Sequence, residues 1–268
     1  MDCTILIFTC AMFSDLWDNQ IQLLNKFWPE HPPYYLVSDT LGLYGRGQEN
    51  RTLCLSKSQS TRLIMALEHC STEYVFLTLD DYFLKGQVNH ERLENIIQTM
   101  HAEGIDYCRL YPKFTTKTPT LQVDNELKRI SFQRGVYEVN FYPGVWKRES
   151  LLAVLAPEET IWEAEVFLSR RFKDKNFIGV AERKMTVYPF VDVVRKGKYL
   201  RPAYRFMKKN DLFISDRPLR SRSEDFVLWI QGAVKSCTPR RLRPLAKKLG
   251  RKLGMKFYSD KLLEDESK

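Results

Sequence analysis

The sequence predicts an α/β fold: a doubly wound, mostly parallel sheet with helices on both faces, an added antiparallel section and a C-terminal helical, basic extension. Three observations support this prediction. Strand-like and helix-like segments alternate between residues 3 and 111. The apolar strand at 74–79 stops abruptly at two aspartates, as expected where a strand leaves a core. Short alternating segments and turns between residues 112 and 148 are typical of antiparallel strands.

The first half has the strand and helix order of a parallel sheet. Prolines 29, 32 and 33 end the first helix, and Ser58 gives the second helix a strong N-terminal cap. The glycine-rich loop at 42–47 is neither a Walker A loop nor a GxGxxG turn after a strand, which counts against a dinucleotide oxidoreductase. The expected strands are 3–10, 34–39 and 74–79, and the expected helices are 17–27 and 58–69.

The second half mixes helices with shorter strands. We place a domain boundary after residue 200, so that 1–200 form the main domain and 201–268 the extension. The expected helices are 89–103, 150–156 and 161–172; the expected strands are 105–111, 129–133, 137–141, 177–181 and 185–194.

Composition fits a protein with a sizeable core, because 44% of the 268 residues are hydrophobic and 13% are aromatic. No run approaches the ~18 apolar residues of a membrane span. The apolar segment 4–13 follows Asp2 rather than a basic flank, so we expect a first strand there and not a signal peptide. The six cysteines stand singly in apolar contexts, which favours reduced thiols over a zinc cluster or disulfides.

The net charge of +9 belongs to one segment. Residues 235–256 carry nine Lys and Arg and no acid, so the remainder of the chain is neutral. Four leucines recur along one side of the same segment, at 242, 245, 249 and 253. A basic amphipathic helix of this kind binds anionic membrane surfaces, and we expect residues 235–257 to do so. Nucleic-acid binding is the rival use of the charge, but the neutral remainder makes an extended nucleic-acid footprint unlikely in this chain.

Polar residues follow three of the predicted strands. These are Thr9-Cys10, Ser38-Asp39 and Asp80-Asp81. Parallel strands end at one edge of a sheet, where α/β proteins place their ligands. Two carboxylates there suit a divalent cation or the hydroxyls of a sugar, although an Asp-Asp pair can also open a turn. Arg62, near the start of the preceding helix, can pair with an aspartate or a phosphate, or lie on the surface.

A second acidic cluster, Glu163 and Glu165, lies near a helix start beside Trp162. The helix dipole favours acids at such positions in any protein. Glu165, however, shares the stripe of Ile161 and Leu168 that faces the protein, which makes it a candidate general base with a raised pKa. No nucleophile motif surrounds the four histidines, so a Ser-His-Asp or Cys-His hydrolase has no support.

In order along the chain, these motifs resemble a GT-A glycosyltransferase of the bacterial kind that builds capsule or lipopolysaccharide. The matching features are the strand at 4–10, the acid Asp39, the DXD-like run 79–82, and Glu165 with Leu168 three and Arg171 six positions on. The runs 142–148 and 175–180 are similar to the family segments on either side of that helix.

The resemblance implies an inverting transferase in which Glu165, with Glu163 nearby, deprotonates the acceptor. It implies donor contacts from Thr9, Cys10, Asp39, Arg62, Asp80 and Asp81, and acceptor-side positions for Trp146 and Trp162. Arg195, Lys196 and Lys198 would neutralise the diphosphate, or form a solvated charge run.

The same resemblance implies Mg²⁺ or Mn²⁺ at Asp81 and Asp80, although Asp-Asp-Tyr is not a literal Asp-x-Asp and metal-independent catalysis stays open. The donor would be a nucleotide sugar, UDP-linked on the family pattern, and the acceptor a lipid-linked glycan or polysaccharide. The protein would then be cytoplasmic and peripheral at the inner face of the membrane. The alternatives are a nucleotidyltransferase, a retaining transferase, or a non-catalytic basic adaptor.

Overall fold

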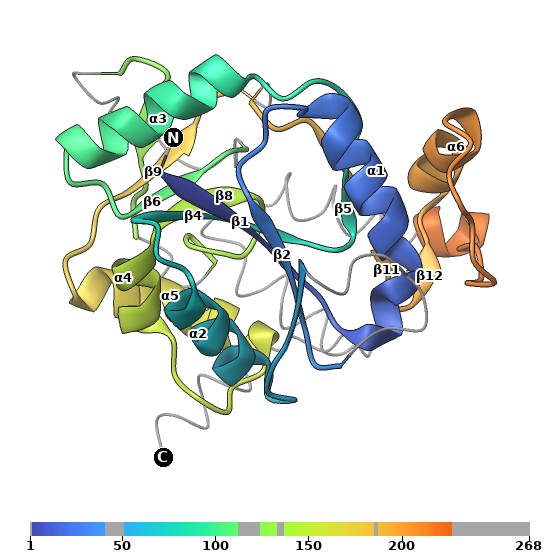
Figure 1. Cartoon of the computed structure of the whole chain (residues 1–268), viewed down its shortest axis with the longest axis horizontal. Helices are drawn as coiled ribbons and strands as arrows, with labels where there is room; N and C mark the ends of the chain where they lie inside the picture. The colour runs from blue at the N-terminus through green and yellow to red at the C-terminus, as the bar shows by residue number, and fades with distance from the viewer. Residues whose placement is uncertain (1, 41–50, 112–123, 133–136, 185–186, 227–268) are drawn as a thin grey trace.

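An eight-stranded sheet runs through the centre of the protein, with the strand order β3-β2-β1-β4-β8-β6-β9-β7 (Figure 1). The computed structural model describes residues 2–40, 51–111, 124–132, 137–184 and 187–226. Parallel pairing joins β3, β2, β1 and β4, and also β6 and β9, whereas β8 and β7 run antiparallel to their neighbours. The strands are β1 (Cys3–Phe8), β2 (Tyr34–Ser38), β3 (Thr52–Cys54), β4 (Tyr74–Leu79), β6 (Tyr107–Arg109), β7 (Leu127–Arg129), β8 (Gly144–Lys147) and β9 (Gly179–Glu182).

Helices cover both faces of this sheet, as Figure 1 shows. On one face, α1 and α3 pack with α6 in the hydrophobic cluster that contains Ile5 and Ile7 of β1. On the other face, α2, α4 and α5 pack against Leu6 and Phe8 of the same strand. Side chains alternate between the two faces along a strand, so β1 contributes to both clusters. The helices are α1 (Trp17–Phe27), α2 (Gln59–His69), α3 (His90–Ala102), α4 (Arg148–Val154), α5 (Ile161–Asp174) and α6 (Arg201–Lys209), and a 3₁₀ helix, η1 (Ala11–Leu16), precedes α1.

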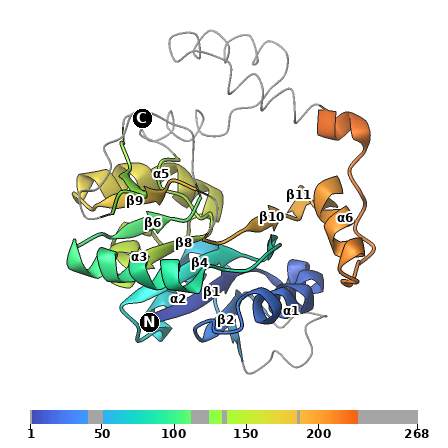
Figure 2. The same ribbon diagram turned by 90° about the horizontal axis from the view of Figure 1, so that it is seen from above.

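The chain leaves the sheet at the two aspartates that follow β4. Beyond them, β5 (Tyr82–Leu84) pairs antiparallel with β10 (Phe190–Asp192), and the Val193 N–H donates to the Asp81 carbonyl at 2.8 Å. A short hairpin, β11 (Val194–Arg195) and β12 (Lys198–Tyr199), then leads into α6, which lies beside β11 on the α1 side of the molecule (Figure 2). Only Asp80 and Asp81 therefore separate β4 from the β5–β10 sheet.

The predicted α/β fold, with its parallel sheet, helices on both faces and antiparallel section, is confirmed. The expected strand at 137–141 is wrong. Tyr137 has a positive φ of 56°, and the N–H groups of Glu138 and Val139 donate to Ser169 Oγ of α5 instead of to a strand. A side chain thus satisfies the backbone donors that a strand would have used. The next strand along the chain is the antiparallel strand β8, which begins at Gly144.

The start of the predicted C-terminal extension shares the main core. Ala203, Met207 and Leu212 are buried in the same cluster as α1 and α3. The domain boundary expected after residue 200 stays a prediction. The glycine-rich loop at 42–47 and the basic segment 235–257 lie outside the described residues. No helix within the described ranges combines the length and the apolar character needed to cross a bilayer.

Candidate functional site

Three parallel strands end together at one edge of the sheet. Phe8 of β1 lies opposite both Val37 of β2 and Leu79 of β4, and backbone bonds continue past each strand end. The Thr9 N–H donates to the Val37 carbonyl at 3.0 Å, and the Asp80 N–H to the Phe8 carbonyl at 3.3 Å. The residues that follow these strands are consequently neighbours, as the sequence predicted for this edge.

Asp80 is held at this edge by a short chain of hydrogen bonds. Trp17 Nε1 donates to Thr9 Oγ1 at 2.8 Å, and Thr9 Oγ1 donates to Asp80 Oδ2. Asp80 is only 7% exposed, and burial raises its pKa despite the Thr9 hydroxyl, which favours the ionised form. Cys10, half-buried beside Asp80, also has a raised pKa, first from burial and then from the Asp80 charge. A negative charge at this edge is therefore unfavourable unless a cation lies nearby.

Asp39 ties the loop after β1 to the end of β2. Its Oδ1 accepts the N–H of Ala11 at 2.8 Å and the N–H of Thr40 at 3.0 Å. Burial alone would raise the pKa of Asp39, but these donors and the charge of Arg62 outweigh it, so the pKa lies below its ordinary value. Asp39 is thus an ionised acceptor at the mouth of the same edge.

Arg62 is buried behind these acids, with only 1% of its surface exposed. Its Nη1 donates to the Ser56 carbonyl at 3.1 Å, and its guanidinium lies 5.0 Å from the centre of the Phe8 ring. Among the residues that the structure describes, its buried Nε has no hydrogen-bond partner. Burial lowers the pKa of Arg62, while the charges of Asp39, Cys10 and Asp80 act against that change. The expected surface alternative for this arginine is therefore wrong, and its charge faces the strand ends.

Unlike Asp80, Asp81 accepts no hydrogen bond from another side chain among the described residues. Its Oδ1 is buried and accepts no hydrogen bond from the described residues. Burial raises its pKa well above the ordinary value, and the charges of Asp80 and Asp192 raise it further. Arg195 acts in the opposite direction but is itself paired with Asp192 at 2.7 Å. A buried acid beside other acids either stays protonated or is ionised together with a cation that offsets its charge.

These residues fit a divalent cation that takes most of its coordinating oxygens from a bound ligand and from water. No cluster of three or more His, Cys, Asp or Glu suited to a metal occurs within the described part of the chain. Mg²⁺, however, is usually held by one or two carboxylates together with water and phosphate oxygens. The unpartnered Asp81 Oδ1 supplies one such carboxylate. Asp80, already bonded to Thr9, is the weaker candidate.

An aromatic cluster links the two aspartates to Glu165. The rings of Tyr82 and Tyr142 are stacked with centroids 5.3 Å apart, and Tyr111 lies 4.6 Å from Tyr142. Burial raises the pKa of all three phenols, and the negative charge of Glu165 raises each of them further. Asp192 acts on Tyr82 and Tyr142 in the same way. Glu165, Asp81 and Asp192 therefore all lie near enough to the cluster for their charges to act on it.

The two glutamates of α5 have different surroundings. Glu165 is half-buried and accepts the Phe141 N–H at 3.4 Å, so it faces the segment that precedes β8. Glu163 accepts the Thr160 N–H at 2.8 Å while Thr160 Oγ1 accepts the Glu163 N–H, which is a capping box. Glu163 stabilises the start of α5, and this is a correction to its expected place beside the catalytic base.

The remaining predicted positions do not all gather at this edge. Trp146 is fully buried between Tyr107 and Phe172, so it cannot contact an acceptor directly, which corrects the expectation. Trp162, in contrast, is 62% exposed at the start of α5. Of the three basic residues after β10, Arg195 is paired with Asp192 and Lys198 with Glu224 at 2.8 Å. Lys196 is exposed in the turn of the β11–β12 hairpin, with a positive φ of 53°.

Sequence reasoning missed the residues that surround the predicted acids. Asp192 reaches the edge from β10, and nothing in its local pattern marks it. Tyr142 lies in the run 142–148, but the resemblance of that run assigned no role to the tyrosine itself. Asp15 pairs with Arg217 across some 200 positions, at a distance of 2.5 Å. The folded topology brings such residues together, and no sequence spacing encodes it.

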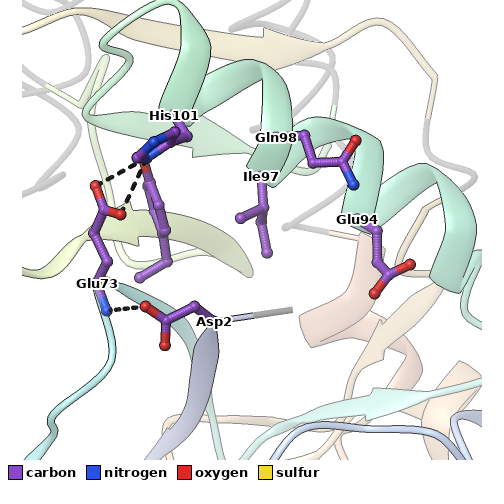
Figure 3. Close-up of a pocket in the computed structure, with 7 residues that line it drawn as sticks. Asp2, Glu73, Glu94, Ile97, Gln98 and His101 are labelled. Atoms are coloured by element: carbon purple, nitrogen blue, oxygen red, sulfur yellow. Dashed lines mark hydrogen bonds and ion pairs between the residues drawn. The ribbon is translucent and has the colours of Figure 1, made fainter.

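A pocket of about 350 Å³ lies at the opposite edge of the sheet. Asp2 and Glu73, which line it, precede β1 and β4, and Figure 3 shows His101 of α3 reaching Glu73. The Glu73 side chain is bonded to His101 at 3.1 Å, and the Glu73 N–H to Asp2 at 3.1 Å. The pocket is therefore separate from the edge that holds Asp80 and Asp81.

Comparisons with known proteins give distant structural likeness only. No family model and no curated protein matches the sequence. Among solved structures, Staphylococcus aureus TarS 1–349 in its UDP complex is 12% identical, with a TM-score of 0.44 over 70% of this chain and 59% of that one. TarS 1–349 itself aligns at 13% identity and a TM-score of 0.47, and this chain spans 59% of its length.

A mannosyltransferase, PcManGT from Pyrobaculum calidifontis in complex with GDP-Man and Mn²⁺, is 13% identical, with a TM-score of 0.48 over 99% of this chain and 79% of that one. A cytidylyltransferase from Leptospira borgpetersenii is 10% identical, with a TM-score of 0.43 over 82% of this chain and 100% of that one. At these values the likenesses do not establish an activity.

Proposed function

We propose that this protein is a glycosyltransferase that moves a sugar from a nucleotide-sugar donor to an acceptor hydroxyl. One observation carries the proposal: the strand-end acids Asp39, Asp80 and Asp81 share an edge with the buried Arg62, and Glu165 faces the aromatic cluster beside them. The edge thus offers hydrogen-bond acceptors for a nucleoside, charges for a diphosphate and a carboxylate base across from them.

The donor would lie over the ends of β1, β2 and β4. Asp39, ionised and near the surface, suits a nucleoside's base or ribose donors. Arg62, whose Nε has no partner among the described residues, compensates negative charge from behind. Arg195, whose charge acts on Asp81, and Lys196, the next residue of the same hairpin, would contact the phosphates. Each contact favours the anionic, diphosphate-bearing part of a nucleotide sugar.

The chemical step would be a displacement at the anomeric carbon. Glu165 accepts the proton of the acceptor hydroxyl, and the resulting oxygen forms a bond to the anomeric carbon. The bond from that carbon to the donor phosphate breaks at the same time, and the nucleoside diphosphate leaves with the electron pair. Attack from the face opposite the leaving group inverts the configuration. Glu165 has Phe141 N–H as a donor, which orients its carboxylate.

Asp81 would hold Mg²⁺ or Mn²⁺, with Asp80 as a weaker candidate. Such an ion supplies positive charge that stabilises the leaving diphosphate. The observation that favours it is the buried Asp81 Oδ1, which has no hydrogen-bond partner in the part of the chain that the structure describes.

The finer proposals concern the acceptor and the membrane. A lipid-linked glycan would explain a basic amphipathic segment at residues 235–257, because the segment would hold the enzyme at the surface where its acceptor lies. Trp162, exposed at the start of α5, suits stacking against an acceptor sugar. This arrangement corresponds to a peripheral protein at the cytoplasmic face, working in surface polysaccharide synthesis.

Transfer assays with a panel of nucleotide sugars test the proposal. We expect one donor to release its nucleoside diphosphate and Asp81→Ala to abolish that release. Asp2→Ala, at the opposite edge of the sheet, is the matched control and should leave release unchanged. Release of pyrophosphate from a nucleoside triphosphate would instead identify a nucleotidyltransferase. No binding of any nucleotide sugar, together with full biological function of Asp81→Ala, would refute an enzyme and favour a basic adaptor.

A further inference from the structure

The chain that follows α6 returns to the residues that follow β1. Asn19 of α1 bonds the Phe213 backbone twice: its Nδ2 donates to the carbonyl at 2.7 Å, and its Oδ1 accepts the N–H at 3.0 Å. Tyr199 and Ser215 then join through their hydroxyls at 2.9 Å. These contacts fix residues 213–217 against η1 and α1, next to the edge where Thr9 meets Asp80.

Arg217 is the most constrained side chain of this segment. Its Nε donates to Asp15 Oδ2 at 2.6 Å, and its Nη2 donates to Asp15 Oδ1 and, at 2.6 Å, to the Met12 carbonyl. The guanidinium also lies over the Phe13 ring, 4.5 Å from its centre. Asp15 is buried and accepts a further bond from Ser215 Oγ. The guanidinium is therefore held in one orientation by partners on three sides.

One nitrogen of this guanidinium is left for a ligand. Nη1 of Arg217 bonds none of the described residues, and it is not among their fully buried orphan atoms. The positive charge of Arg217 also acts on Asp80, where it favours the ionised carboxylate and so acts to lower the pKa. A fixed arginine with a free donor loses little freedom on binding an anion, which is the usual basis of strong phosphate recognition.

We propose that Arg217 is an anion-binding residue of the donor site, and that its Nη1 donates to the phosphate groups of a nucleoside diphosphate. The inference rests on the proposed function, because it assumes that a nucleotide lies over the end of β1. It adds to that function a contact from beyond residue 200. The alternative is a purely structural role, in which Arg217 acts as a clasp that only holds residues 213–217 against η1.

Calorimetric titration of the full chain distinguishes an anion-binding role of Arg217 from a purely structural one. UDP, GDP and CDP are each compared with their nucleosides, which lack the phosphates. For the preferred nucleotide, we expect Arg217→Gln to weaken diphosphate binding by about 10- to 100-fold, the loss of a charge-assisted hydrogen bond, and to leave nucleoside binding unchanged. Arg217→Lys, which keeps the charge but not the fork, should give an intermediate loss.

Arg205→Gln is the matched control, because Arg205 is exposed on α6 in the same part of the chain. Equal diphosphate affinity in Arg217→Gln and the unchanged chain would overturn the inference, and so would an equal loss for diphosphate and nucleoside, which is the signature of a clasp. If Arg217→Gln does not fold, Arg217→Lys decides by the same comparison. Failure of the unchanged chain to bind any nucleoside diphosphate would overturn the proposed function as well.

Discussion

Replacing Asp80 by Asn tests directly whether a negative charge is unfavourable at this edge. Asp80 is almost fully buried, and its hydroxyl partner Thr9 is neutral. Burial raises the pKa of Asp80 from 3.8 to about 7. Asn keeps an oxygen that accepts from Thr9 and cannot ionise. The substitution therefore removes the charge while it preserves the hydrogen bond.

The magnitude follows from linkage between protonation and folding. An acid whose pKa is raised in the folded state contributes its full stability below the unfolded pKa and loses it as the pH rises through the folded pKa. A rise of about three pKa units corresponds to about 4 kcal/mol at most, at 1.36 kcal/mol per unit. Of that, about 2 to 3 kcal/mol is lost between pH 5 and pH 8, since the unfolded acid is already mostly ionised at pH 5. Asp80→Asn should be the more stable protein, with an advantage that grows over this range.

Urea unfolding at several pH values between 5 and 8 measures the difference. Asp124→Asn is a control that should lose stability by about the same amount at every pH in this range. Burial would raise the pKa of Asp124, but Arg92, bonded to it at 2.6 Å, lowers the pKa overall. Its contribution to stability is present above the unfolded pKa and is lost as the pH falls. Parallel pH profiles for Asp80→Asn and the unchanged chain would refute the reasoning, because they would mean that Asp80 has the same pKa folded and unfolded.

Three further predictions concern the proposed activity. Glu165→Gln should lower kcat by about 10²- to 10⁴-fold in a transfer assay, with nucleotide affinity unchanged, and an undiminished kcat would exclude Glu165 as the base. Chelation with EDTA should weaken nucleoside diphosphate binding in calorimetry, and added Mn²⁺ or Mg²⁺ should restore it; binding that is insensitive to the chelator would remove the metal role of Asp81. Deletion of residues 235–268 should abolish sedimentation with phosphatidylserine vesicles at low salt, and undiminished sedimentation would contradict a membrane role for this segment.

The alternation of strand and helix patterns was enough to predict the parallel part of the sheet. Residues 74–79 illustrate why, since a buried strand must end where two aspartates appear. The same reasoning failed at 137–141, whose alternating side chains look like a strand. There, Ser169 of α5 takes the backbone donors that a strand would have offered to a neighbour. A pattern within a few residues cannot reveal a partner about 30 positions away.

The candidate site was predictable most directly where its residues follow strands. Thr9, Asp39 and Asp80 follow three parallel strands, so the fold alone makes them neighbours. Arg217 follows no strand, and its place depends on the packing of α6 and on Asn19 and Asp15. Glu163 and Glu165 show the converse limit. Their positions near a helix start were clear, but only the capping box on Thr160 separates a structural glutamate from a candidate base.

The charges at this edge favour a ligand that carries both negative and positive charge. Each of three arginines is anchored before any ligand arrives: Arg62 by the Ser56 carbonyl, Arg195 by Asp192 and Arg217 by Asp15. Anchored guanidinium groups suit a diphosphate, because they lose little freedom on binding it. Asp80 and Asp81 would repel the same diphosphate if they were ionised without a partner. A diphosphate that binds together with a divalent cation at Asp81 satisfies both requirements, whereas a diphosphate alone satisfies only the first.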